Sequence, residues 1–507
     1  MKLLMGALAA VSLAVALAAQ EPAPPSACAA LSSLNLPHTA ITAAEAGDVA
    51  KLIPSGGGGA TPPPAVAELP PFCRVAATIK PSTDSNIKIE VWMPASGWNG
   101  KLQGVGNGGW AGTISYPLLV SALRRGYATA STDTGHSGDG RNGSFALDRP
   151  ETLVDFAWRS VHEMTVDAKA IVKAFYGRAP KLAYWNGCST GGKQGLTEAQ
   201  RFPADYDGII AGAPANYWTH LMASGVWMGQ ATLKDSSAYI PREKYALIHR
   251  AALDACDAVD GMKDGLIDNP ARCTFDPAVL ACAAEETAEC LTRPQVDAAR
   301  KIYGGAKSPR TGEPIFPGLE PGSELGWGAM AGGPAPFPIT NDHFKYVVFK
   351  DPTWDFKTLD FDRDVALADR VDNGLLNATD PDLRKYFARN GKLLLYHGWN
   401  DQLIAPRNTV NYYERVVSVT GAKSAQSIRL FMAPGMGHCA GGEGPNTFDA
   451  LAAIEQWVET NKAPDQLLAS HSTRGVVDRT RPLCAYPQTA RYGGTGSTDE
   501  AANFTCR

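Results

Sequence analysis

The sequence predicts an α/β fold, because a short apolar run, a glycine-rich turn, a helix-forming stretch and a second apolar run follow one another directly. Residues 181–185 and 208–211 have the length and composition of buried strands. Between them, residues 187–191 form the predicted turn and residues 192–201 the predicted helix. A strand, a helix and a second strand in this order form a parallel βαβ unit.

The strand pattern returns far along the chain, so we expect the sheet to be discontinuous in sequence. Residues 392–396 and 428–432 predict two more strands, and residues 448–459 predict a helix after them. From residue 217 to residue 385 the periodicity breaks up into short helical pieces and Gly- and Pro-rich loops, which indicates an inserted lid domain. The predicted α/β core therefore comprises residues 19–216, beginning with an N-terminal arm, and residues 386–507.

The first part of this core contains further elements. Residues 87–91 alternate apolar and polar side chains as in a half-buried strand, and residues 102–105 predict a second strand before the turn Gly106-Asn107-Gly108-Gly109. Residues 151–175 repeat apolar side chains on one helical face over about seven turns. That helix is expected to cover one face of the sheet.

Composition excludes several classes of protein. The 507 residues include 47 Lys and Arg against 51 Asp and Glu, a net charge of −4, which does not favour a nucleic acid as partner. With 44% hydrophobic and 19% charged residues, the chain has ample material for a large core and is not of the disordered type.

The N-terminus predicts export. Lys2 is followed by an uncharged stretch in which Ala16 and Ala18 are spaced for signal peptidase, so residues 1–18 are interpreted as a signal peptide. No later segment offers roughly 18 consecutive apolar residues for a membrane span. We therefore expect a secreted or periplasmic protein with no membrane partner, in which the ten cysteines form disulfides.

A candidate nucleophile lies in the turn of the βαβ unit. Gly187-Cys188-Ser189-Thr190-Gly191 is a GxSxG pattern that follows a predicted strand and opens a predicted helix. This context is that of the nucleophile elbow of an α/β-hydrolase, a strained turn that lifts the serine hydroxyl clear of the sheet. The alternative is a glycine-rich connecting turn.

A serine nucleophile needs a base and an acid that orients it, in the chain order serine, acid, histidine. Asp401 lies just past the predicted strand at 392–396, and His438 follows the strand at 428–432 in the same way. Both loops belong to the carboxyl ends of strands, where the active sites of open sheets form. His397 was set aside as a base because it precedes its nearest acid.

Two cysteines flank these residues. Cys188 directly precedes Ser189, and Cys439 directly follows His438, so a site that joins nucleophile and base also brings the two thiols together. In an exported protein we expect them to form a disulfide that clamps the elbow to the histidine loop. The alternative, a buried free thiol beside Ser189, leaves Cys439 as a coincidence.

The set Gly187-Cys188-Ser189-Thr190-Gly191-Gly192, Asp401 and His438-Cys439 resembles that of the tannase/feruloyl esterase family, which also includes mono(hydroxyethyl) terephthalate hydrolase. The resemblance covers most of the chain beyond the signal peptide. It implies an α/β-hydrolase with a lid that cleaves aromatic-acid esters. It also implies the remaining disulfide pairs, which are Cys28 with Cys73, Cys256 with Cys273, Cys282 with Cys290, and Cys484 with Cys506.

An oxyanion hole is required to hold the charge that develops on the ester carbonyl oxygen. The amide of Thr190, directly after the nucleophile, is one predicted donor. The second is expected from Gly108 or Gly109 in the turn after an early strand, and the sequence does not choose between them.

The insertion contains a candidate calcium site in residues 256–268, where carboxylates and glycines alternate. The spacing does not match an EF-hand loop. By resemblance to the family, a structural calcium ion would be bound by three aspartates and two backbone carbonyls, which here are Asp257, Asp260, Asp264, Met262 and Leu266. The alternative is a solvated acidic turn.

The substrate is predicted only as a class. The resemblance implies a small aromatic ester, of ferulate or another hydroxycinnamate, of gallate, or a terephthalate half-ester, whether or not it is attached to plant polysaccharide or polyphenol. Ile404 stands where an aromatic residue could clamp a terephthalate ring, which favours a feruloyl ester. Six tryptophans are candidates for stacking on the ring: Trp110, Trp218, Trp227, Trp327, Trp354 and Trp399.

A terephthalate half-ester would require an arginine in the pocket. The insertion offers eight candidates without marking one: Arg242, Arg250, Arg272, Arg293, Arg300, Arg310, Arg363 and Arg370.

Two other functions share parts of the pattern formed by the serine, the acid and the histidine. A non-catalytic binder of polyphenol or carbohydrate has no need of Ser189, Asp401 and His438 in this order, and a serine peptidase would differ only in cleaving amides.

Overall fold

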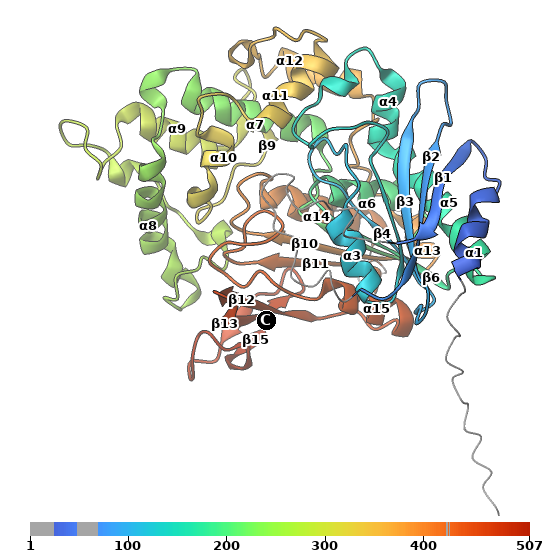
Figure 1. Cartoon of the computed structure of the whole chain (residues 1–507). Helices are drawn as coiled ribbons and strands as arrows, with labels where there is room; N and C mark the ends of the chain where they lie inside the picture. Colours follow the sequence, from blue (N-terminus) through green and yellow to red (C-terminus); the bar gives the residue numbers. More distant parts are fainter. Residues whose placement is uncertain (1–24, 48–68, 422–423, 425) are drawn as a thin grey trace, which may run out of the picture.

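A computed structural model describes residues 25–47, 69–421, 424 and 426–507 (Figure 1). The predicted signal peptide at residues 1–18 lies outside the described residues.

The described chain is organised around a nine-stranded mixed sheet in the order β1-β2-β3-β5-β4-β6-β7-β10-β11. The edge from β1 to β5 is antiparallel, and the strands from β5 through β11 run parallel. The strands are β1 (Thr39–Ala46), β2 (Phe72–Ile79), β3 (Ile87–Pro94), β4 (Lys101–Val105), β5 (Ala128–Thr132), β6 (Leu182–Cys188), β7 (Gly208–Gly212), β10 (Lys392–Gly398) and β11 (Ile428–Ala433).

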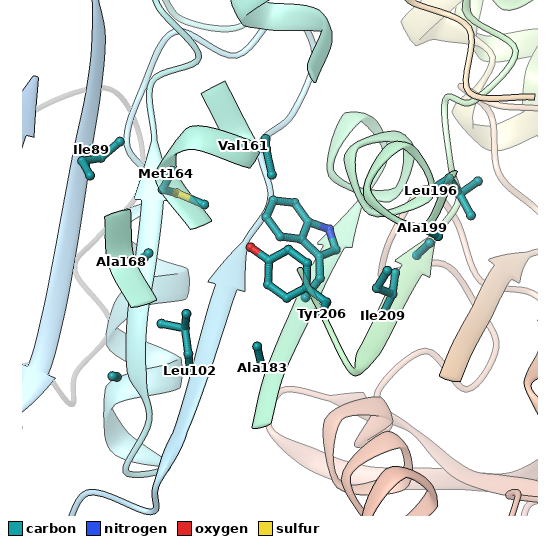
Figure 2. Packing of buried hydrophobic residues seen from close by; sticks show 14 of the residues in the cluster. Ile89, Leu102, Val161, Met164, Ala168, Ala183, Leu196, Ala199, Tyr206 and Ile209 are labelled. Carbon is teal, nitrogen blue, oxygen red and sulfur yellow. The ribbon is translucent and has the colours of Figure 1, made fainter. Parts of the chain in front are cut away.

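Helices cover both faces of this sheet, as parallel strands require. One face packs through Leu102, Trp185 and Ile209 against α5, α6 and α14, and the other through Tyr184 and Leu394 against α3 and α15. Figure 2 shows part of the first interface, with Val161 and Met164 on one helix and Leu196 on another. The helices are α3 (Tyr116–Arg124), α5 (Ser160–Tyr176), α6 (Thr190–Arg201), α14 (Pro406–Thr420) and α15 (Ala450–Thr460).

Residues from β7 to β10 form the long connection that the sequence predicts as an insertion. Figure 1 shows most of its helices gathered in green to gold above the sheet. Trp327, Ile302 and Phe344 belong to its apolar core, which continues into Trp110 and Ile404 of the sheet's loops. Its elements are α7 (Trp218–Leu233), α8 (Tyr245–Cys256), α9 (Arg293–Gly304), α10 (Gly328–Ala331), α11 (Pro338–Asp342), α12 (Arg363–Asp372), α13 (Arg384–Ala388), β8 (Ala306–Lys307) and β9 (Pro314–Phe316).

One sequence expectation needs correction, and the N-terminal arm contains elements that were not predicted. Its helix α1 (Pro25–Ala30) packs beside β1, and β1 and β2 extend the sheet. The helix expected at 151–175 is interrupted by one π-helical turn, with α4 (Pro150–Val154) before it and α5 after it. In that turn, buried Asp155 accepts hydrogen bonds from Arg159 and Ser85, a polar contact that apolar periodicity does not reveal.

Beyond α15 the chain forms two small hairpins, and disulfides tie its distant parts together. The hairpins are β12 (Gln466–Thr473) with β13 (Val476–Cys484), and β14 (Ala490–Tyr492) with β15 (Phe504–Cys506). The disulfides are the five expected pairs, Cys28–Cys73, Cys188–Cys439, Cys256–Cys273, Cys282–Cys290 and Cys484–Cys506. Within the described ranges, none of the helices combines the length and apolarity that a membrane span requires.

Candidate active site

Ser189 occupies a strained turn between β6 and α6. Its backbone has φ of +64° and ψ of −123°, in a region that residues with a side chain rarely adopt. The turn is tighter than expected from the sequence, since the strand runs to Cys188 and the helix begins at Thr190. The amide of Ser189 donates to the carbonyl of Gly212 on β7, which anchors the turn to the sheet at 2.9 Å.

The glycines of this turn are required by close packing. A Cβ on Gly187 would lie 2.5 Å from the carbonyl oxygen of Gly191, and a Cβ on Gly191 would lie 3.1 Å from the Cα of Gly106. Since real Cβ atoms avoid such distances, the flanking positions of the GxSxG pattern accept only glycine without a backbone shift. The local sequence therefore explains why the strained turn forms here.

Asp401 and His438 meet at the carboxyl ends of β10 and β11. Nδ1 of His438 lies 2.7 Å from Oδ2 of Asp401, whose side chain is fully buried. Oδ1 of Asp401 accepts the backbone amides of Leu403 at 2.8 Å and Ile404 at 2.9 Å. These bonds fix the carboxylate so that it aligns the imidazole of His438.

His397, which the sequence analysis set aside, completes the surroundings of Asp401. Its Nε2 lies 3.0 Å from Oδ2 of Asp401 and 3.0 Å from the carbonyl oxygen of Ile404, while Nδ1 lies 2.7 Å from the hydroxyl of Thr409. Nε2 therefore carries the hydrogen and Nδ1 accepts from Thr409, because a carboxylate and a carbonyl both need a donor. The signal that could have found this residue is its spacing of four from Asp401 at a strand end.

The charges of the pair follow from these contacts. Burial disfavours the ionised form of Asp401, but His438 and His397 together hold the pKa of its carboxyl well below the usual range. For His438, burial disfavours the cation, yet Asp401 raises the imidazole pKa above its usual value. Asp401 thus stays ionised while His438 keeps a proton affinity suited to a general base.

Ser189 and His438 face the same cavity, next to the disulfide between Cys188 and Cys439. The two cysteine Cα atoms lie 6.0 Å apart, so this bond holds the elbow and the histidine loop side by side. Among the hydrogen bonds of the described residues there is none between Ser189 and His438. In hydrolase sites without substrate this contact is often long and tightens when substrate binds.

Three backbone amides beside Ser189 are available to an incoming oxygen. Thr190 is the first residue of α6, so its N–H has no partner within the helix. Across the cavity, the amides of Gly108 and Gly109 donate to no acceptor among the described residues. The hydroxyl of Thr190 donates to the carbonyl of Gly109 at 2.7 Å and joins the two loops.

Gly109 differs from Gly108 in what it tolerates. Gly109 has φ of +54°, and a Cβ there would lie 2.2 Å from the carbonyl oxygen of Gly140. A Cβ on Gly108 would meet nothing within 4 Å. Both amides line the cavity, so the structure keeps both as candidates for the second oxyanion donor.

The cavity has a volume of about 620 Å³ and is mostly apolar. Trp218 and Met222 of α7 and Phe337 and Ile339 before and in α11 supply much of its wall. Apart from His438, no ionisable side chain of the described residues lines it, so none of the eight arginines of the insertion reaches it. Of the six candidate tryptophans, Trp218 lines the cavity and the other five do not.

The acidic loop of the insertion holds its carboxylates close to the C-terminal hairpin. Both oxygens of Asp257 accept backbone amides, from Asp264 at 3.0 Å and Gly265 at 2.9 Å. The fully buried guanidinium of Arg481 on β13 contacts Asp264 and Asp268.

This loop retains unsatisfied oxygens that fit a cation. Oδ2 of Asp260 is buried with no hydrogen-bond partner, and no hydrogen bond of the described residues ends on the carbonyls of Met262 or Leu266. Burial raises the pKa of Asp268 to about 7 despite Arg481, a sign that one guanidinium does not neutralise the cluster. Carboxylate and carbonyl oxygens are the ligands that calcium prefers.

Comparison with known proteins agrees with this geometry. Residues 73–507 match the family described as tannase and feruloyl esterase. The chain is 39% identical to an uncharacterized esterase of Xanthomonas campestris pv. campestris, over 95% of this chain and 91% of that protein. It is 35% identical to a probable feruloyl esterase B-1 of Aspergillus fumigatus, over 85% of each.

Solved structures show the same fold. Feruloyl esterase B from Aspergillus oryzae superposes with a TM-score of 0.87 at 29% identity and covers 95% of this chain and 100% of that chain. Tannin acyl hydrolase from Aspergillus niger superposes with a TM-score of 0.77 at 22% identity, over 97% of this chain and 96% of that one. The predicted α/β-hydrolase fold is therefore confirmed.

Proposed function

Since this chain belongs to the tannase and feruloyl esterase family, a family of esterases, we propose that it cleaves uncharged aromatic-acid esters through an acyl-enzyme on Ser189. The observation that carries the proposal is the position of Ser189 on a strained elbow, facing a cavity that it shares with His438, whose imidazole is bound to buried Asp401.

In the first step, Oγ of Ser189 attacks the ester carbonyl carbon, and Nε2 of His438 takes the hydroxyl proton. Asp401 holds the hydrogen on Nδ1 and stabilises the imidazolium that forms. When the tetrahedral intermediate collapses, the bond to the alcohol oxygen breaks and His438 returns its proton to that oxygen. Water then repeats the sequence on the acyl-enzyme and releases the acid and free Ser189.

The negative oxygen of each tetrahedral intermediate would be held by the amide of Thr190 together with that of Gly108 or Gly109. Support comes from the three available N–H groups at the cavity wall. Donors that are already in place stabilise developing charge without reorganisation, which is worth about 10²–10³-fold per donor in kcat.

The acid part of the substrate is proposed to be a hydroxycinnamate such as ferulate. The cavity offers apolar walls and the ring of Trp218 to an aromatic acyl group, and no arginine or lysine to a terephthalate carboxylate. The hydroxyls of Ser115, Thr190 and Thr340 already donate to backbone carbonyls, so toward the three hydroxyls of a gallate they would serve only as acceptors.

The insertion is proposed to act as the lid, because it supplies one side of the cavity from α7, α10 and α11. The proposed domain division into residues 19–216 and 386–507 for the core and 217–385 for the lid follows from this role. Export is proposed on the N-terminal signal and the disulfides, which are typical of oxidising compartments. Outside the cell, ester groups on plant polysaccharide or polyphenol would be available as substrates.

A structural calcium ion is proposed in the acidic loop, held by Asp257, Asp260 and Asp264 with the carbonyls of Met262 and Leu266. The bound ion would supply a partner to the buried Oδ2 of Asp260, which has none among the described residues. It would also join the insertion to the hairpin that carries Arg481. The test is thermal unfolding of chelator-treated protein with and without added calcium, beside Asp260→Asn and the exposed control Asp297→Asn. Calcium should raise the Tm of the wild type and control only; equal shifts in all three proteins exclude this loop.

The esterase proposal is tested with methyl ferulate, methyl gallate and mono(hydroxyethyl) terephthalate, following acid release by chromatography. Ser189→Ala should lower kcat by about 10⁶-fold. Ser33→Ala, an exposed serine beside β1, is the matched control and should keep wild-type activity. Turnover should follow the order ferulate, gallate, terephthalate half-ester.

Other outcomes separate the alternatives. Preference for gallate or for the terephthalate half-ester would replace the proposed acyl group but keep the mechanism. Cleavage of the matching amides at a similar rate would indicate a peptidase. Ligand binding without turnover of any ester would indicate a polyphenol or carbohydrate binder and contradict the assignment of Ser189.

A further inference from the structure

Three ligand-type side chains meet behind the sheet, away from the cavity of Ser189. His162 lies on α5, Glu198 near the end of α6, and Asp205 in the loop between α6 and β7. Among the described residues, this is the one group of His, Cys, Asp or Glu side chains whose ligand atoms all lie within 4.8 Å of one another. Nδ1 of His162 lies 2.7 Å from Oδ2 of Asp205.

Glu198 makes this cluster more than a histidine–aspartate pair. Its side chain is 1% exposed, and neither carboxylate oxygen has a hydrogen-bond partner among the described residues. A buried carboxylate without a partner is costly, and native structures nearly always satisfy it. An ion that accepts its lone pairs would remove that cost.

The neighbouring polar groups that the structure describes do not donate hydrogen bonds to Glu198. The hydroxyl of Tyr206 is hydrogen-bonded to that of Thr165 on α5 at 2.6 Å. Nζ of Lys169 donates to the carbonyl oxygen of Asp205 and lies 4.0 Å from its carboxylate. Its charge also acts on Glu198, but it makes no hydrogen bond to that carboxylate. None of these groups therefore donates a hydrogen bond to the carboxyl oxygens of Glu198.

We propose that His162, Glu198 and Asp205 bind a divalent transition-metal ion of the Zn²⁺ type. One imidazole nitrogen and two carboxylate oxygens are a ligand set that zinc accepts, and water can complete the tetrahedron. The ring of Phe202 stacks on His162 at 3.8 Å and fixes its plane. The His162 side chain is 26% exposed, which leaves a route for the ion.

The ion would have a structural role and is independent of the proposed esterase function. Ser189 precedes α6, and Glu198 lies nine residues further on, on the order of 13 Å along the helix axis. The ion would join α5, α6 and the loop before β7, and so stabilise the helix that positions the nucleophile. Since all ten cysteines are in disulfides, thiolates do not compete for the metal.

The test is isothermal titration of Zn²⁺ into tag-free, metal-stripped full-length protein, with calcium in excess so that oxygen-only sites are filled. One Zn²⁺ per chain is expected, together with an increase in Tm. Glu198→Gln keeps the size and hydrogen-bonding capacity of the side chain but removes its charge, and it should weaken binding by at least about 10-fold. Co²⁺ bound in place of Zn²⁺ should show tetrahedral absorption that the variant lacks.

Two further variants make the result decisive. His162→Gln should weaken Zn²⁺ binding to a similar extent. If Glu198→Gln does not fold, His162→Gln alone tests whether this cluster binds the ion. His471→Gln is the matched control, because His471 pairs with Asp478 at 2.6 Å without a third carboxylate in the group. Absence of Zn²⁺ binding, or equal affinity in wild type and the folded ligand variants, would overturn the proposal and leave Glu198 as a buried protonated acid.

Discussion

Two regions of the molecule combine histidines and carboxylates around a buried central group, in opposite arrangements. In the candidate active site, one carboxylate, Asp401, lies between His438 and His397. Where the insertion meets the histidine loop, one imidazole, His249, lies 2.8 Å from Glu324 and 2.8 Å from Glu443. In each case the central group is held in its charged form by two partners.

The difference shows why one region can move protons and the other cannot. Asp401 stays ionised, so His438 at its side can gain and lose a proton during a reaction. For His249, burial disfavours the cation, but Glu324 and Glu443 raise the imidazole pKa to about 9. The central imidazole is therefore a fixed positive charge, which suits an attachment between insertion and core.

The largest expected effect breaks the catalytic arrangement at its centre. Asp401→Asn keeps the size of the side chain but removes the charge that aligns His438, so kcat should fall by about 10⁴-fold. The far-ultraviolet circular dichroism and Tm should remain close to those of the wild type. A kcat within 10-fold of the wild type would contradict the role of Asp401.

A smaller effect is expected from the outer imidazole. His397→Leu removes the Nε2 donor of buried Asp401, and a hydrogen bond to a charged group is worth about 1.5–3 kcal/mol. We expect kcat to fall by about 10- to 100-fold with little change in KM. His397→Gln, which keeps a donor, should recover much of the loss. Equal losses in both variants, or an increase in KM alone, would contradict a positioning role.

The pH dependence of activity sharpens the same comparison. His438 must be neutral to accept the serine proton, and its pKa lies above the usual value because of Asp401. Activity should therefore decrease as pH falls through a midpoint above about 6.5. In Asp401→Asn the residual activity should show this acid limb at lower pH. An unchanged midpoint would mean that another group sets the limb.

The smallest effect concerns stability at the other arrangement. The pKa of His249 is raised in the folded protein to about 9, from an unfolded value of about 6.5. Its stabilisation is therefore complete below about pH 6.5 and is lost as pH rises through about 9. As pH rises from about 6.5 to about 9, the Tm of the wild type should decrease, and the Tm of His249→Gln should decrease less. The pair of His471 with Asp478 is the control. The Tm of His471→Gln should change with pH as the Tm of the wild type does.

Much of the fold and of the candidate site could be predicted because the signals are local. The strand, turn and helix around Ser189 come from one stretch of residues, and Asp401 and His438 each follow an apolar run that ends in a loop. The strand β1 was missed because it is a half-exposed edge strand that consists largely of small residues. The strand β2, which pairs with it inside the sheet, was not predicted either. His397 was missed because it was considered only as a base, although its spacing of four from Asp401 could have marked it as a partner of that carboxylate.

By itself, the sequence determined the parallel part of the α/β core, the position of the candidate nucleophile and the order of serine, acid and histidine. These follow from hydrophobic period and from the glycines that a tight turn requires. Only the tertiary structure decided what crosses between distant segments: the packing of the insertion beside Ser189, the uncharged walls of the cavity, and the approach of His162 to Glu198 and Asp205. Such contacts depend on how helices pack on the sheet, and no regular spacing along the chain predicts them.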